Sequence, residues 1–296
     1  MALAIKADGA LPAAAARRAG GGRVLVGIAG AVVFAIILAA VFAPWLVTHD
    51  PFAQDLFHLN TAPGGEHPLG TDHIGRDVYS RLVMGARLTL IVGAGGAAIA
   101  FLLGGALGLL GMALGRWGER VVFAVIDLVR AVPGILLALL IIVAVGEGTG
   151  PVTLALGVSF APFFAYVARA TFKREAAQDY VRVAGLFGGG RLHVLRLHIL
   201  PNLCGSLVTQ AAIILPRCIV TESVLSFLGL GSSPDAPTWG RMISDASRYL
   251  EVSPHAILAP IAALVALTVS LLVLGDALRE RLDPLRAGAL PPGAVR

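Results

Sequence analysis

The sequence lacks the residue patterns that most often perform catalysis. A phosphate-binding loop requires a Gly-Lys-Ser/Thr run, because its lysine must reach the nucleotide phosphates. The two lysines, Lys6 and Lys173, precede Ala7 and Arg174 instead. The chain also contains no His-Glu-x-x-His zinc motif and no Gly-x-Ser-x-Gly nucleophile turn. We therefore expect no catalytic residue and no cofactor in this chain. An intramembrane enzyme remains an alternative only through an arrangement that residue spacing does not reveal.

The histidines give no metal-binding pattern by their spacing. His193 and His198 are five residues apart, so they do not share a helix face at the i, i+4 spacing of a helical metal pair. The sequence therefore predicts no metal site.

Three ionisable residues fall in or beside apolar segments. Asp127 and Arg130 stand at i, i+3, where structural pairing is favoured over a proton relay. Glu222 either lines a pathway, together with Ser226 and Phe227 at an outer gate, or caps a short helix. A secondary transporter would usually need more ionisable groups near mid-membrane to bind its coupling ion. Their scarcity indicates an energy source outside this chain.

The elements that carry these residues are membrane helices. The chain of 296 residues is 57% hydrophobic and only 14% charged, with a mean hydropathy of +0.83. Soluble domains carry about a quarter charged residues. Unbroken apolar runs of about 18 residues or more cross a bilayer as helices, whereas barrel strands alternate. The fold class is therefore all-α, a polytopic membrane protein.

Six spans are expected, which would place both termini on one side of the membrane. They are Val24–Trp45, Leu88–Leu114, Val121–Val145, Pro151–Ala168, Leu203–Val220 and Ile257–Leu274. The expected organisation is a tail (1–23), the first helix with an outer loop (24–87), a core of five membrane helices that includes the segment 169–202 (88–284) and a second tail (285–296).

The arginines and lysines predict the orientation. With cytoplasmic termini, sixteen of the 23 basic residues fall in inner segments, as the positive-inside rule requires. They are Lys6, Arg17, Arg18, Arg23, Arg116, Arg120, Arg169, Lys173, Arg174, Arg182, Arg191, Arg196, Arg279, Arg281, Arg286 and Arg296. The segment 169–202 is then cytoplasmic, and the connections His49–Arg87 and Thr221–Pro254 are outer loops. Both termini of this multi-pass protein are then cytoplasmic.

The long polar insert between the fourth and fifth spans is predicted to form a helix–turn–helix. Glu175–Arg182 has a helix-favouring start, and Gly188–Gly190 would break the helix. Arg191–Leu200 forms the second helix and is expected to end before Pro201. A solvated basic loop at the inner leaflet would explain the arginines. Docking to a cytoplasmic partner also explains the apolar Ala/Tyr/Val face.

This insert resembles the EAA motif of binding-protein-dependent ABC importer permeases. The resemblance rests on Glu175-Ala176-Ala177, the turn glycine Gly188 and Ile199-Leu200-Pro201. "DYV" at Asp179–Val181 and "LHILPN" are similar to the peptide and nickel branch, although Leu197 stands where that branch commonly has arginine.

Two outer stretches resemble the same branch, in its second permease subunit, the DppC/OppC type. They are "HPLGTDHIGRDVYSRLVMGARLTL" (His67–Leu90) and "ESVLSFLGLGSSPDAPTWGRMI" (Glu222–Ile243). With the six-span layout, the resemblance covers the chain from Val24 to Pro284. It implies the type I ABC importer permease fold.

The resemblance also implies partners. Such permeases are multi-pass proteins of the bacterial inner membrane. They work in the lipid bilayer with a homologous second permease, two ATPase subunits that bind ATP and Mg²⁺, and an extracytoplasmic substrate-binding protein. No nucleic acid is expected. The EAA helix docks on the ATPase, which assigns the coupling role to Glu175, Ala176, Ala177, Asp179, Tyr180, Gly188 and Pro201.

The outer loops have two interpretations. Asp72, Arg76 and Asp77 form a salt-bridged loop, or they and Trp239 contact the binding protein or the partner permease; Trp239 is equally an interface anchor.

Dipeptides or short peptides are the expected substrate. Nickel or another small solute is the alternative, and a non-transport scaffold is a further one.

Overall fold

The computed structural model describes residues 11–187, 190–231 and 235–282. The described chain contains helices α1 to α11, one π-helical turn (Leu195–Ile199) and one 3-10 turn (Ser247–Tyr249), and no named strand. The helices are α1 (Leu11–Val41), α2 (Ala43–Leu46), α3 (Val78–Ala113), α4 (Gly115–Ala131), α5 (Gly134–Val145), α6 (Thr149–Ala176), α7 (Asp179–Leu186), α8 (Arg191–Val194), α9 (Leu200–Phe227), α10 (Trp239–Ala246) and α11 (Pro254–Leu282). The all-α class is confirmed. Helix α1 starts inside the expected tail 1–23.

Five described helices are long and apolar enough to cross a membrane, namely those containing Gly22–Val41, Val78–Ala113, Thr149–Ala176, Leu195–Phe227 and Pro254–Leu282. A sixth span exists only as the pair α4 and α5, which meet at 91°. The span expected over Val121–Val145 is thus interrupted by a bend that the apolar run did not predict. Val132 is extended (φ −85, ψ 128) directly before Pro133, because a residue preceding proline is pushed out of the helical region.

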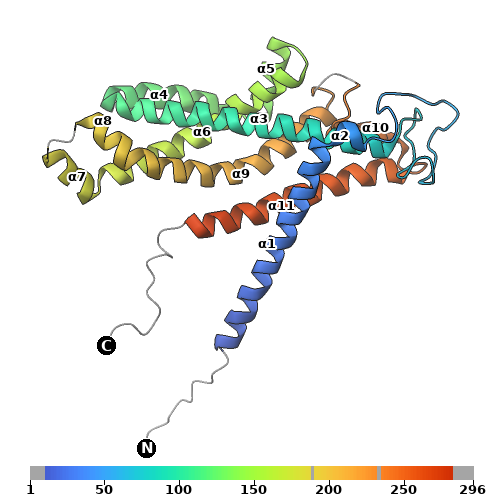
Figure 1. Ribbon diagram of the computed structural model, residues 1–296. Helices are drawn as coiled ribbons and strands as arrows, with labels where there is room; N and C mark the ends of the chain where they lie inside the picture. Colours follow the sequence, from blue (N-terminus) through green and yellow to red (C-terminus); the bar gives the residue numbers. More distant parts are fainter. Residues whose placement is uncertain (1–10, 188–189, 232–234, 283–296) are drawn as a thin grey trace, which may run out of the picture.

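The two ends of the bundle carry different structures (Figure 1). Helices α3, α4, α6 and α9 run side by side, with α7 and α8 at one end and the 47–77 loop with α10 at the other. Helix α3 packs most extensively against α6. Helix α1 leans away from this body beside α11 and exposes most of its apolar length.

Glycines decide how closely α3 approaches α6. A Cβ on Gly104 would lie 2.1 Å from the Ala161 carbonyl oxygen, and one on Gly108 would lie 2.7 Å from that of Ala165. Small residues allow such backbone contact in lipid, where close packing replaces the hydrophobic effect as the driving force between helices. The Gly-xxx-Gly spacing of α3 therefore serves packing within the chain at these two positions.

We expect Gly104→Ala to destabilise the α3–α6 pair by about 1–3 kcal/mol, because the added methyl overpacks a rigid backbone contact. Gly105→Ala is the matched control, since its Cβ would meet only the end of the Leu207 side chain at 3.1 Å. Resistance of the purified protein to unfolding by sodium dodecyl sulfate measures the difference. Equal resistance of the two variants would contradict the packing argument.

The predicted helix–turn–helix of the insert is only partly correct. The helix expected over Glu175–Arg182 is divided: α6 continues to Ala176, and a new helix, α7, begins at Asp179. The helix expected to end before Pro201 instead continues into α9, which starts at Leu200. Proline lacks the N–H of a regular helix, and the π-helical turn Leu195–Ile199 lies immediately before it. Gly190 lies outside the helices, whereas Gly188 lies outside the described residues.

Candidate functional site

The segment 169–202, called the EAA loop below, is centred on one buried carboxylate. Glu175 lies in the last turn of α6 and is 7% exposed. Its Oε2 accepts hydrogen bonds from the Tyr180 hydroxyl at 2.6 Å and from the Asn202 amide at 3.2 Å. Its Oε1 accepts one from Arg174 Nε at 3.0 Å. Because Tyr180 belongs to α7 and Asn202 to α9, Glu175 joins three helices.

The contacts around Tyr180 strengthen this junction. The hydrogen bond to the Glu175 carboxylate raises the pKa of Tyr180 above its usual value, because losing the proton would leave two negative oxygens together. The Tyr180 ring lies against the His198 ring with centroids 5.5 Å apart. The Asn202 amide also donates to the His198 carbonyl oxygen at 3.0 Å. The arrangement fixes where α7 sits relative to the ends of α6 and α9.

Beside this junction, α7 presents an uncovered apolar ridge. Tyr180, Val183 and Phe187 are 43%, 47% and 88% exposed. Tyr180 and Val183 are three residues apart on α7, so they share one side of the helix, and Phe187 follows directly after the helix ends. Ala176, Ala177 and Asp179 are exposed next to the ridge, at the turn between α6 and α7. A ridge with this spacing is the form in which a helix inserts into an apolar groove of another protein.

A second carboxylate ties α4 to α6. Glu119 Oε1 accepts from Lys173 Nζ at 2.6 Å and from Arg169 Nε at 2.7 Å. The Arg169 guanidinium also lies over the Phe123 ring, 4.4 Å from its centroid. Two of the basic residues counted for orientation therefore also hold the bundle together at the EAA-loop end.

At the opposite end, the four predicted contact residues are all buried within the chain. Asp72, Arg76, Asp77 and Trp239 are 6%, 6%, 2% and 1% exposed. Arg76 donates from Nε to Asp72 at 2.6 Å and from a terminal nitrogen to Asp245 at 3.0 Å. Asp72 and Arg76 thus form the predicted salt bridge, which Asp245 of α10 extends. Trp239 Nε1 donates to the Leu82 carbonyl oxygen at 2.9 Å, so this ring packs against α3.

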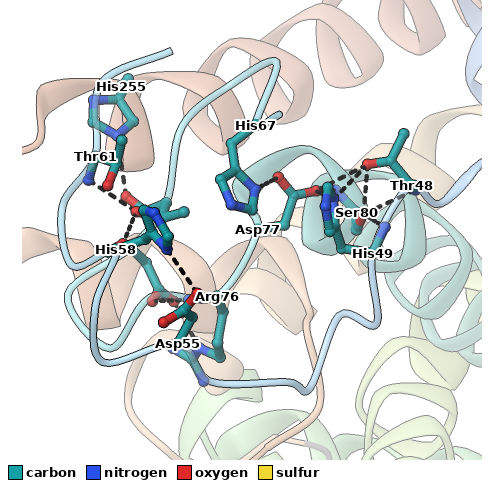
Figure 2. A network of polar contacts seen from close by, with 12 residues as sticks. Thr48, His49, Asp55, His58, Thr61, His67, Arg76, Asp77, Ser80 and His255 are labelled. Atoms are coloured by element: carbon teal, nitrogen blue, oxygen red, sulfur yellow. Dashed lines mark hydrogen bonds and ion pairs between the residues drawn. The ribbon is translucent and has the colours of Figure 1, made fainter. Parts of the chain in front are cut away.

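Asp77 has a different role from its neighbours (Figure 2). It is the N-cap of α3, and its Oδ2 accepts from the Ser80 backbone N–H at 2.8 Å. Its Oδ1 lies 2.9 Å from His67 Nδ1. Burial alone would raise the pKa of Asp77, but the hydrogen bonds from Ser80 and His67 outweigh it and leave the pKa below its usual value. Sequence spacing did not reveal this role for His67, which stands ten residues away.

The predicted outer-gate residues lie in the last turns of α9. Glu222 is 1% exposed, and its Oε1 accepts from the Ser226 hydroxyl at 2.7 Å. Phe227 is 43% exposed. The carboxylate of Glu222 is thus buried and bound to a hydroxyl one turn further along its own helix.

A cavity of ≈ 350 Å³ lies at the bend between α4 and α5. Its lining combines Arg130, Ser159 and Thr221 with aromatic rings of Phe160 and Phe163. Arg130 also lies over the ring of Tyr166, 5.2 Å from the centroid, and the Tyr166 hydroxyl donates to Asp127. Asp127 and Arg130 therefore meet through Tyr166. Ligand sites commonly have this size, with apolar walls and a few polar groups.

Comparisons with known proteins agree with this architecture. Residues 100–287 match the family model described as binding-protein-dependent transport system inner membrane component. Residues 25–63 match the N-terminal transmembrane domain of oligopeptide transport permease C.

Curated relatives match over most of their length. The chain is 34% identical over 259 residues to a glutathione transport system permease protein of Pectobacterium atrosepticum, covering 86% of this chain and 85% of the relative. It is 35% identical over 256 residues to a di/tripeptide transport system permease protein of Pseudomonas aeruginosa, covering 84% of each. It is 31% identical over 257 residues to a probable D,D-dipeptide transport system permease protein of Escherichia coli, covering 87% and 86%.

Solved structures show the same fold. A chain of a methionine ABC transporter in an inward-facing conformation superposes with a TM-score of 0.57 at 20% identity, covering 69% of this chain and 96% of that one. A chain of an amino acid ABC transporter gives 0.54 at 16% identity, covering 69% and 94%. The expected ABC importer permease fold is confirmed, and the protein belongs to the family of inner membrane components of binding-protein-dependent transport systems.

Proposed function

We propose that this chain is one of two permease subunits of an ATP-driven importer, and that it forms half of the pathway for dipeptides or short peptides. An extracytoplasmic binding protein delivers the peptide, and two partner ATPase subunits bind ATP and Mg²⁺ and supply the energy. The peptide substrate is supported by relatives whose names specify glutathione, di/tripeptides and D,D-dipeptides. In this proposal both termini and the EAA loop face the cytoplasm.

The observation that carries the coupling role is the Glu175 junction beside the exposed ridge of α7. In our proposal the ridge of Tyr180, Val183 and Phe187 inserts into a groove of the ATPase, with Ala176, Ala177, Asp179 and Gly188 at its margin. Glu175 and the Leu200–Pro201 start of α9 pass the movement on to α6 and α9. A rigid-body movement can be transmitted only through elements that do not bend at their connections.

The outer loops would contact the binding protein through their exposed residues. Asp72, Arg76, Asp77 and Trp239 are buried, so their contribution would be to hold the loop shape. Phe57 of the 47–77 loop is 96% exposed and is therefore better placed for direct contact with the binding protein. Glu222, Ser226 and Phe227 stay our proposal for the outer gate.

The cavity at the α4–α5 bend is our proposed passage for the peptide. Binding sites of transporters often lie where a membrane helix is interrupted. A charged residue inside a span faces a water-filled space or a partner, because exposure to lipid is costly. In this proposal Arg130 binds the carboxylate of the passing peptide, and Ser159 and Thr221 supply further polar groups in the lining of the same cavity.

We expect Arg130→Gln to reduce the rate of uptake of a free dipeptide by about 10–100-fold, because a hydrogen bond to a charged group contributes about 1.5–3 kcal/mol. Uptake of the C-terminally amidated peptide should change little. The measurement compares both peptides in vesicles that contain the complete transporter. Arg120→Gln on the same helix is the control and should leave both rates unchanged. Equal losses for both peptides would contradict the carboxylate contact.

The proposed function itself is tested by reconstitution. The two permeases and the ATPases are reconstituted in vesicles with the ATPases and ATP inside. The binding protein and labelled dipeptide are added outside, and the dipeptide that enters the vesicles is measured. Uptake that requires both ATP and the binding protein is expected. Uptake of nickel but of no peptide would favour the metal-importing alternative, and absence of any uptake would favour a scaffold.

A further inference from the structure

Two histidines lie against the N-cap of α3 in the 47–77 loop (Figure 2). His67 Nδ1 is 2.9 Å from Asp77 Oδ1, and His49 Nδ1 is 4.0 Å from Asp77 Oδ2. The centroids of the two imidazole rings are 4.6 Å apart. One ligand atom from each of the three residues lies within 4.8 Å of the other two. Three positions that are distant in sequence therefore meet in one small space.

The residue types match the ligands of a divalent transition metal. Two imidazoles and one carboxylate, with water in the fourth position, make a tetrahedral site of the kind that Zn²⁺ occupies. Imidazole nitrogen favours Zn²⁺ and its neighbours in the first transition row, whereas Mg²⁺ and Ca²⁺ require mostly oxygen ligands.

The surrounding contacts hold the carboxylate in place. Asp77 Oδ2 accepts from the Ser80 backbone N–H at 2.8 Å and from the Thr48 hydroxyl at 3.4 Å, and its side chain is 1% exposed. Such outer contacts orient a metal ligand. The Thr48 hydroxyl also contacts His49 Nδ1 at 3.1 Å. The His49 side chain is 42% exposed, which leaves a path from solvent for the ion.

The nearby arginines do not occupy this space. Arg76 is bound to Asp72 and Asp245, and Arg81 donates to the Pro51 carbonyl oxygen at 3.0 Å. Among the described residues, the ion-pair contacts of Asp77 are with histidines only. A buried carboxylate is stabilised by hydrogen bonds and by a nearby cation, and a metal ion would add the cation.

We propose that His49, His67 and Asp77 bind one divalent transition-metal ion, for which Zn²⁺ is the best match. For His67 Nδ1 to bind the ion, the imidazole proton must lie on Nε2, so that the ring stays neutral, and the ion then takes the place of the hydrogen bond to Asp77. It would join the residues after α2 and the middle of the 47–77 loop to the first turn of α3. Its role would be to hold the loop that we propose faces the binding protein.

The test uses the assembled transporter, purified with a tag that contains no histidine and stripped of metal by a chelator. Zn²⁺ binding is measured by calorimetry and by metal content after dialysis, and Co²⁺ is added as a spectroscopic probe of a tetrahedral nitrogen–oxygen site. His49→Ala is the decisive variant, because this exposed side chain is removable without opening the core. His58→Ala is the control, since its ring lies 6.3 Å from that of His67 and its Nδ1 is bound to Asp55 at 2.7 Å.

We expect His49→Ala to lower the Zn²⁺ affinity of this site at least about tenfold, as loss of a ligand or its support does, and to remove the Co²⁺ absorption. The His58→Ala transporter should bind Zn²⁺ like the wild type. Excess Mg²⁺ should not displace Zn²⁺ from either protein. The proposal is overturned if wild type and His49→Ala bind the same amount of Zn²⁺ with the same affinity. It is equally overturned if the wild type binds no Zn²⁺.

Discussion

Replacement of Glu175 by alanine is expected to uncouple ATP hydrolysis from uptake. The substitution removes the acceptor shared by Tyr180, Asn202 and Arg174, and hence the junction of α6, α7 and α9. Hydrogen bonds to a charged group contribute about 1.5–3 kcal/mol each. The bond from Tyr180 ties α7 to α6 and the bond from Asn202 ties α9 to α6, so the substitution loosens both connections at once. We expect uptake per ATP hydrolysed to fall at least about tenfold.

The measurement is the ratio of peptide taken up to ATP hydrolysed in vesicles that contain the complete transporter. Tyr180→Phe removes one donor and keeps the apolar ridge, so it should give a smaller loss. Glu119→Gln is the matched control for a carboxylate at the same end of the bundle, because Glu119 joins α4 to α6 and does not contact α7. A Glu175→Ala transporter with the wild-type ratio of peptide taken up to ATP hydrolysed would contradict the coupling proposal.

Replacement of Arg76 by leucine is expected to cause the largest loss of stability. Arg76 is almost completely buried and binds Asp72 and Asp245 at 2.6 and 3.0 Å. Removal of one partner from a buried ion pair costs about 3–5 kcal/mol, because the remaining charge stays buried without compensation. Here two carboxylates would lose their shared cation, and only the longer contacts of Asp72 with Arg81 at 4.0 Å and of Asp245 with Arg241 at 3.2 Å would remain. The free energy of unfolding in sodium dodecyl sulfate, measured on the purified protein, checks this prediction.

Arg241→Leu provides the control, because Arg241 approaches the same carboxylate from a more exposed position. Its Nε lies 3.2 Å from Asp245 Oδ1 without meeting hydrogen-bond geometry, and its side chain is 30% exposed. Exposed pairs contribute about 0.2–1 kcal/mol. A loss for Arg241→Leu as large as that for Arg76→Leu would show that burial does not distinguish the two arginines.

The spans illustrate what local sequence encodes and where it misleads. The apolar runs predicted the helices α1, α3, α6, α9 and α11, because hydropathy and helix length act within one segment. The signal for the bend was present in Pro133, but hydropathy alone joined α4 and α5 into one span. Pro201 misled in the opposite direction: it lies at the start of α9, directly after the π-helical turn Leu195–Ile199, and a proline is tolerated in the first turn of a helix.

The Gly-xxx-Gly spacing of α3 likewise separates what local sequence encodes from what helix packing decides. Such spacing permits close approach of a second helix, whereas packing alone decided that α6 of the same chain is the partner of Gly104 and Gly108. Gly115, which also has this spacing from Gly111, is the first residue of α4 and has a φ of 79°. Its role is the positive φ that glycine tolerates.

By itself, the sequence determined the helical membrane class, the positions of the polar inserts and the motifs that carry the family resemblance. These depend on composition and on residues close together in the chain. Only the tertiary structure decided that Glu175 meets Asn202, that Arg76 meets Asp245 and that His49 and His67 meet Asp77. The physical reason is that these residues are far apart along the chain and are brought together in space by the packing and bending of helices. No local sequence pattern records that packing.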